Sequence, residues 1–137
     1  MADNTPYPVE LITPVGPAYR ADAQRLVAPG AAGQLGVLAN HAPLISLIKA
    51  GEVRITDEQG ELHRFAVDDG FLQVRKNHAL VLVGEAVAAE QINAGEAARR
   101  LEEAQEALAR AEGGDGDVHA ARREVGFATA LVKTASG

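Results

Sequence analysis

The chain has 137 residues and a formal net charge of −6, which argues against a nucleic-acid binder, because such proteins present a basic surface. It contains no cysteine, and this excludes disulfide bonds and thiolate metal sites. Apolar residues make up 47% of the chain but aromatic residues only 4%, so we expect one domain with an aliphatic core, plus an appendage.

No segment predicts export or membrane insertion. The first ten residues, MADNTPYPVE, have neither a basic start nor an apolar stretch. The longest purely aliphatic run, Ala79–Val83, is far shorter than the ~20 residues that a membrane-spanning helix needs. We therefore expect a soluble chain.

The segment Gly33–Ile45, with the sequence GQLGVLANHAPLI, joins two apolar runs through a loop. Glycines at positions 30, 33 and 36 supply backbone angles that other residues avoid, while Pro43 fixes its own φ and favours an extended residue before it. The segment predicts a strand, a shaped loop and a second strand. It does not predict a phosphate loop, because it is apolar and no Lys-Ser or Lys-Thr follows the glycines.

Up to about Val87 the apolar residues recur with period two, as in half-buried strands. Turn residues separate the runs at 57–60, 69–70 and 76–78. Short strands at this spacing, with no helical pattern between them, predict an antiparallel β-sandwich or barrel. The apolar pairs are Val53 with Ile55, Phe65 with Val67, Leu72 with Val74 and Leu80 with Leu82, and the addition of Val81 and Val83 suggests a last strand buried on both faces.

From Ile92 the period changes to that of a helix. Asn93 is a suitable N-cap and Glu96 follows three residues later, as in a capping box. Glycines at 113, 114 and 116 break this helix, and Asp117 can cap a second one. The predicted stripes are Ala94, Ala97, Leu101, Ala104, Leu108 and Ala111 in the first helix, and Val118, Ala121, Val125, Ala128, Val132 and Ala135 in the second.

Together these patterns predict an α+β chain, with an N-terminal antiparallel β-sandwich over residues 1–90 and a C-terminal antiparallel two-helix hairpin over residues 91–137. Alanine buries little area but forms helices well, so seven alanines among the twelve stripe residues predict two stable helices that are weakly joined. Close, permanent packing of small residues is the alternative. Residues 118–137 carry three cations against one anion, which suggests an acidic partner inside or outside the chain.

No constellation of residues predicts catalysis or metal binding. Asp68 and Asp69 are adjacent before a glycine, but neighbours on a strand point to opposite faces, so a turn or strand end is the better interpretation of this pair. The four histidines, at positions 41, 63, 78 and 119, lack the spacing of metal ligands. Neither serine lies in a nucleophile elbow. We expect no catalytic residue, no metal and no cofactor.

The motif GQLGVLANHAPLI, followed by Ala50-Gly51, Val53-Arg54-Ile55 and Gly70-Phe71-Leu72-Gln73-Val74, resembles the epsilon subunit of rotary F-type ATP synthases from about Val9 to Ala135. The resemblance implies a non-catalytic central-stalk subunit, a rotor part that couples the gamma subunit to the c-ring for proton-driven ATP synthesis. It also implies that the C-terminal hairpin either folds against the sandwich or extends into the alpha/beta catalytic hexamer, where it inhibits ATP hydrolysis. The expected location is peripheral, at the cytoplasmic face of a bacterial plasma membrane.

The resemblance also assigns expected contacts to single residues. The ring-facing loop of the family carries over at Gln34 and His41, and a gamma-facing position at Ser46. Three basic residues of the second helix are expected to meet an acidic segment of the beta subunits: Arg122, Arg123 and Lys133.

One family feature does not carry over intact. Some bacterial members bind ATP through the motif I/L-D-x-x-R-A, whose positions here hold Ile92, Asn93, Glu96 and Ala97. An anion where the motif has arginine repels a polyphosphate, so we expect no tight ATP binding by this route. A capping box explains Asn93 and Glu96 better.

Two other functions are compatible with the residues. The first is a freestanding β-sandwich that binds a ligand, such as a nucleotide, and carries a dimerising helical hairpin. The second, which the pattern favours least, is an enzyme using Asp68 and Asp69.

Overall fold

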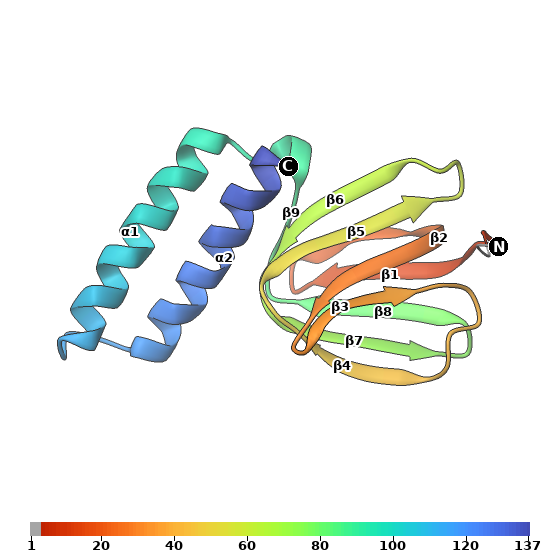
Figure 1. The fold of residues 1–137 in the computed structure, drawn as a ribbon, viewed down its shortest axis with the longest axis horizontal. Coiled ribbons are helices and arrows are strands. Elements are labelled where there is room, and N and C mark those ends of the chain that lie inside the picture. Colours follow the sequence, from red (N-terminus) through yellow and green to blue (C-terminus); the bar gives the residue numbers. More distant parts are fainter. Residues whose placement is uncertain (1–3) are drawn as a thin grey trace.

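The computed structural model describes residues 4–137, which form a β-sandwich followed by two antiparallel helices (Figure 1). The predicted α+β class is confirmed. The strands are β1 (Tyr7–Thr13), β2 (Gly16–Gly30), β3 (Gly33–Val37), β4 (Leu44–Ile48), β5 (Gly51–Asp57), β6 (Leu62–Val67), β7 (Gly70–Arg75), β8 (His78–Val83) and β9 (Ala86–Ala88). A 3₁₀ turn, η1 (Ala89–Gln91), leads to α1 (Ala94–Glu112) and α2 (Val118–Ser136).

The long strand β2 belongs to both layers of the sandwich. Its first half pairs with β1, and its second half pairs with β3 and β5. One layer contains its strands in the order β1-β8-β7-β4. The other contains them in the order β2-β5-β6-β9, and β3 pairs with β2 beside this path. All these pairs are antiparallel except β1–β8, which is parallel and which the sequence pattern did not predict. No hairpin joins β1 to β8, so chain connectivity does not fix their relative direction.

The core is aliphatic, as predicted, and consists of the inward-pointing residues of both layers. Buried residues alternate along β5, where Val53 and Ile55 are fully buried. The prediction for β8 was wrong in one respect: Ala79, Val81 and Val83 point inward, while Leu80 and Leu82 lie half-buried on the outer face. Tyr7 is the largest buried side chain, and its hydroxyl donates a 2.6 Å hydrogen bond to the carbonyl of Val37, tying β1 to the end of β3.

The predicted loop after β3 occupies residues 38–43, at the end of the sandwich remote from the helices (Figure 1). Asn40 has a φ of 62°, a left-handed conformation that asparagine tolerates better than most residues. Its backbone N–H donates to the Asn77 side chain at 2.6 Å, so the loop is tied to the β7–β8 turn. Gly33–Val37 and Leu44–Ile48 are the two strands that the motif predicted.

Both helices begin where the capping residues predict. The Asn93 side chain accepts a hydrogen bond from the backbone N–H of Glu96 at 2.9 Å, and the Asp117 side chain accepts one from that of Ala120 at 3.2 Å. The hairpin is docked on the sandwich, and α2 lies between α1 and the strands β5 and β6 (Figure 1). No helix in the described residues is both long and apolar enough to cross a membrane.

The sequence prediction missed one face of α2. Its predicted stripe is mostly half-buried, whereas the fully buried residues include Phe127, Ala130, Leu131 and Thr134, which lie on the side that faces the sandwich. A helix packed between two neighbours must be apolar on two sides, and a single stripe describes only one of them.

Candidate interaction surfaces and docked hairpin

The outer face of the β1-β8-β7-β4 layer carries an exposed apolar row. The strand register places Leu47 of β4 beside Phe71 of β7, Phe71 beside Leu82 of β8, and Leu82 beside Ile12 of β1. Leu47 is 69% exposed, and Phe71 is 38% exposed. We call Ile12, Leu47, Phe71 and Leu82 the apolar row.

A second line of residues widens this surface. Ile45, which is 75% exposed, pairs with Gln73, which in turn pairs with Leu80. A shallow apolar groove runs beside the row, and its lining includes Phe71, Leu82 and Ile12. Neighbouring exposed aliphatic side chains of this kind mark interaction sites on soluble proteins.

The three residues expected at the rotor interface lie in different places. Gln34 is exposed at the start of β3, next to the turn after β2, whereas His41 lies in the loop beyond the other end of that strand. Ser46 is on β4, but its side chain alternates with those of Ile45 and Leu47 and so points away from the apolar row. The structure therefore does not bring Gln34, His41 and Ser46 together on one surface.

The hairpin packs on the sandwich through a small apolar cluster. Phe127, Ala130 and Leu131 of α2 form one buried cluster with Ala66 of β6 and Ala97 of α1, and Val87 packs against it. This cluster is separate from the core of the sandwich. Thr134 is also buried, and its hydroxyl makes no hydrogen bond within the described residues.

Arginine side chains hold the hairpin at several points. Near the C-terminal end of α2, the Arg64 guanidinium on β6 donates a 2.8 Å hydrogen bond to the carbonyl of Thr134, where a cation also complements the helix dipole. The same guanidinium pairs with Glu52 at 2.7 Å. This end of α2 is therefore bound to the outer face of β5 and β6.

Arg100 joins the two helices to each other and to the sandwich. Its guanidinium makes two hydrogen bonds to Glu124 of α2, at 2.6 and 3.2 Å, lies 3.8 Å from Glu85, and sits 5.0 Å from the centre of the Phe127 ring. The bond to Glu124 raises the pKa of Arg100 despite its partial burial. Arg100 was not predicted as a contact, although the excess of acidic residues on the first helix and of basic residues on the second indicated charge pairing between them, and Glu124 is the one acidic residue of 118–137.

The three basic residues of α2 have different partners. Arg123 donates to the Asp69 carboxylate at 3.1 Å and lies 3.6 Å from that of Asp68. Arg122 lies 3.8 Å from Glu112, at the end of α1. Lys133 is exposed and forms no ion pair within residues 4–137.

Asp68 and Asp69 form the connection between β6 and β7, which agrees with the interpretation as a turn. Burial is the main cause that raises the pKa of Asp68, and the neighbouring Asp69 side chain adds to it, while the hydrogen bond from the Asp69 N–H and the charge of Arg123 act in the opposite direction. The two carboxylates meet a cation from the hairpin and not a reacting group, so their arrangement gives no support to acid–base catalysis.

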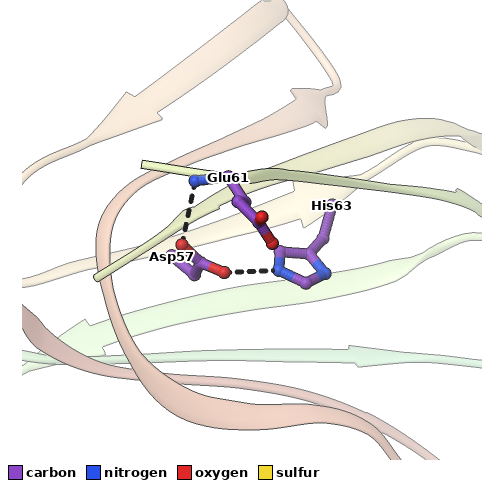
Figure 2. Close-up of side chains that lie close together, drawn as sticks. All are labelled: Asp57, Glu61 and His63. Atoms are coloured by element: carbon purple, nitrogen blue, oxygen red, sulfur yellow. Dashed lines mark hydrogen bonds and ion pairs between the residues drawn. The ribbon is translucent and has the colours of Figure 1, made fainter. Parts of the chain in front are cut away.

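Asp57, Glu61 and His63 gather at the β5–β6 turn, and their potential ligand atoms lie within 4.8 Å of one another (Figure 2). The Asp57 carboxylate accepts hydrogen bonds from the Glu61 N–H at 2.9 Å and from His63 Nε2 at 2.8 Å. The bond from His63 is the main reason why the pKa of Asp57 is lowered. These hydrogen bonds close the turn, and they account for the position of the Asp57 and His63 side chains beside each other.

Residues 7–89 match the family described as "ATP synthase, Delta/Epsilon chain, beta-sandwich domain". Over 110 residues the chain is 41% identical to the ATP synthase epsilon chain of Pelotomaculum thermopropionicum, covering 80% of this chain and 81% of the relative. The chain belongs to the ATP synthase epsilon chain family. The resemblance noted in the sequence is confirmed, and a member of this family is a non-catalytic subunit, as predicted.

Other epsilon chains give similar matches. Identity is 42% over 117 residues with that of Rubrobacter xylanophilus, covering 84% of this chain and 79% of the relative. Identity is 36% over 110 residues with the chloroplastic chain of Chlamydomonas reinhardtii, covering 77% of this chain and 78% of the relative. A chain in the structure of the Euglena gracilis mitochondrial ATP synthase (OSCP/F1/c-ring) superposes with a TM-score of 0.72 over 90% of this chain and 77% of that one, at 21% identity, which shows that the fold is shared.

The four positions of the nucleotide motif of epsilon chains line one shallow pocket, at the start of α1. Its volume is about 180 Å³, and its lining includes Ile92, Asn93, Glu96 and Ala97. Ordinary ligand pockets begin at roughly 300 Å³. Arg100 also lines the pocket, but its guanidinium already donates hydrogen bonds to the Glu124 carboxylate. The expectation that ATP does not bind tightly here therefore stays a prediction.

Proposed function

We propose that this epsilon-family chain is a rotor subunit of a proton-transporting F-type ATP synthase. In this proposal residues 1–90 form the domain that couples the gamma subunit to the c-ring, and residues 91–137 form a regulatory hairpin that inhibits ATP hydrolysis in the alpha/beta hexamer. The chain is peripheral to the membrane, at the cytoplasmic face of a bacterial plasma membrane. Two structures with a similar fold, those of the Euglena gracilis and Tetrahymena thermophila mitochondrial ATP synthases, include a c-ring, which supports this assembly.

The apolar row is the observation that carries this proposal. A face with Leu47 at 69% and Ile45 at 75% exposure needs a partner to cover it. We assign this face to the gamma subunit, with Ile45 and Leu47 on either side of Ser46 as the contacts from β4. The c-ring, whose loops are polar, is assigned to Gln34 and His41, two polar side chains that lie toward opposite ends of β3.

Affinity purification of tagged variants tests the assignment. The parent chain should recover gamma, and the c-ring only together with gamma. Leu47→Lys places a charge in the apolar row and should lower the recovery of gamma at least tenfold, because a charge buried in an interface is strongly unfavourable. Leu62→Lys is the matched control: Leu62 is also exposed, at 55%, but lies on β6 in the other layer.

Equal recovery of gamma by both variants would contradict the assignment of the face. Recovery of the parent chain without gamma would contradict the rotor proposal and would favour a freestanding binding module.

A further inference from the structure

Arg123 lies on the face of α2 that docks on the sandwich. The buried residues Phe127, Ala130 and Thr134 follow it at intervals of three and four, the spacing of one helical face. Docking of the apolar cluster therefore also brings the Arg123 guanidinium to the sandwich. The contact is half exposed, since 50% of the Arg123 side chain remains accessible.

The sandwich holds two carboxylates at the position that Arg123 reaches. The backbone of the Asp68–Asp69 turn is bonded to the β8–β9 connection, because the Asp68 N–H donates to the Glu85 carbonyl at 2.9 Å and the Gly84 N–H donates to the Asp69 carbonyl at 3.3 Å. A side chain at Gly84 would meet the Asp68 carboxylate at 3.1 Å. Among the described residues, Arg123 is the only cation that forms an ion pair with either aspartate.

We propose that Asp68 and Asp69 form an electrostatic site that helps the sandwich retain the hairpin, beside the apolar cluster around Phe127, with Arg123 as the group that they bind. The hairpin must then give up this contact before Arg123 can reach an acidic partner outside the chain. This second consequence rests on the proposed function, whereas the retention site can be tested on the isolated chain.

The absence of cysteine allows the opening of the interface to be measured with a single thiol. Thr134→Cys replaces a buried hydroxyl that has no hydrogen-bond partner in residues 4–137 with a thiol of similar size, which tolerates burial. The thiol reacts with a soluble disulfide reagent only when the hairpin leaves the sandwich, so the labelling rate is proportional to the opening equilibrium. Ala104→Cys reports on the α1–α2 contact instead, because Ala104 is buried and α1 packs chiefly on α2.

In the Thr134→Cys chain, Asp69→Asn and Arg123→Gln should each speed labelling about two- to fivefold, the effect of losing an exposed ion pair. The double variant should label no faster than Arg123→Gln alone, because Arg123→Gln already removes the pairs with both Asp68 and Asp69. Asp22→Asn and Arg99→Gln remove exposed charges that form no ion pair in the described residues, and they should leave the rate unchanged. Labelling at Ala104→Cys should not respond to Asp69→Asn.

Unchanged labelling at Thr134→Cys, or additive effects of the two single changes, would overturn the retention site whether or not the chain is a rotor subunit. In an assembled ATP synthase, Asp69→Asn should lower ATP hydrolysis, because it frees the hairpin while keeping Arg123. Faster labelling with an unchanged hydrolysis rate would leave the retention site in place and overturn the competition with an outside partner.

Discussion

Truncation of Phe127 tests what holds the hairpin on the sandwich. The side chain is 1% exposed, belongs to the same buried cluster as Ala66, and lies beneath the Arg100 guanidinium. Loss of a buried phenylalanine side chain costs about 3–5 kcal/mol if the cavity stays open. An exposed ion pair such as Arg123–Asp69 contributes about 0.2–1 kcal/mol. Phe127 should therefore contribute several times more to docking than that ion pair.

The expected result of Phe127→Ala is release of the hairpin and not unfolding of the chain. The sandwich keeps its own core, which is separate from the cluster around Phe127. A loss of about 3 kcal/mol raises the opening equilibrium by roughly 100-fold, since every 1.4 kcal/mol is tenfold. Amide hydrogen exchange of α2 should accelerate by up to this factor, while amides of β1, β7 and β8 should keep their rates.

Ile55→Ala is the control, because Ile55 is fully buried in the sandwich core and its truncation should speed exchange in the strands. The reasoning would be refuted if Phe127→Ala sped exchange in the strands as much as in α2, or if α2 were unaffected.

Three further predictions concern the hairpin, the pocket and the β5–β6 turn. A chain ending at Gln91 should fold, because the sandwich core contains no residue of the helices. In the assembled enzyme this chain should give faster ATP hydrolysis than the full chain. Equal hydrolysis rates would contradict the inhibitory role and leave the hairpin as a structural brace. Calorimetry of the full chain with millimolar ATP should give no binding isotherm, because the Glu96 carboxylate in the small pocket at the start of α1 repels a polyphosphate. A one-to-one isotherm would show that the charge of Glu96 does not prevent binding. Asp57→Asn should lower the urea midpoint at pH 7, because the pKa of the Asp57 carboxyl is lowered on folding. Such a carboxylate stabilises the fold at pH values above its ordinary pKa of about 4. It loses that contribution as the pH falls through the lowered pKa. The difference between Asp57→Asn and the parent should therefore shrink at pH 3, and a difference that persists there would show that charge is not its cause.

Local features of this fold were predictable from the sequence. The strands around the loop at 38–43, the caps Asn93 and Asp117, and the glycine break between the helices all depend on neighbouring residues. The stripe of Ala121 and Val125 on the second helix was also visible, but it marks only one of two packed faces. The unbroken small and apolar composition of VGFATALV, at residues 125–132, is the signal that could have revealed the second face.

Long-range features could not be predicted in this way. The parallel pairing of β1 with β8 joins residues that are 70 positions apart, and the apolar row exists only because the register aligns single residues from four strands. The turn at Asp68 and Asp69 was predictable, but its partner Arg123 lies 54 residues beyond Asp69. The charge pattern indicated that the basic second helix would pair with acidic groups. It did not indicate whether those groups lie within the chain or on another protein.

A photo-crosslinking amino acid in place of Phe71 tests the central claim most directly. Phe71 lies in the apolar row at 38% exposure, and the same group at Leu62, which is 55% exposed, provides a more accessible control site on the other layer. In membranes that contain the assembled ATP synthase, irradiation should link position 71 to the gamma subunit and leave position 62 without a gamma adduct. A gamma adduct at position 62 with none at position 71 would contradict the assignment of this face to the gamma subunit.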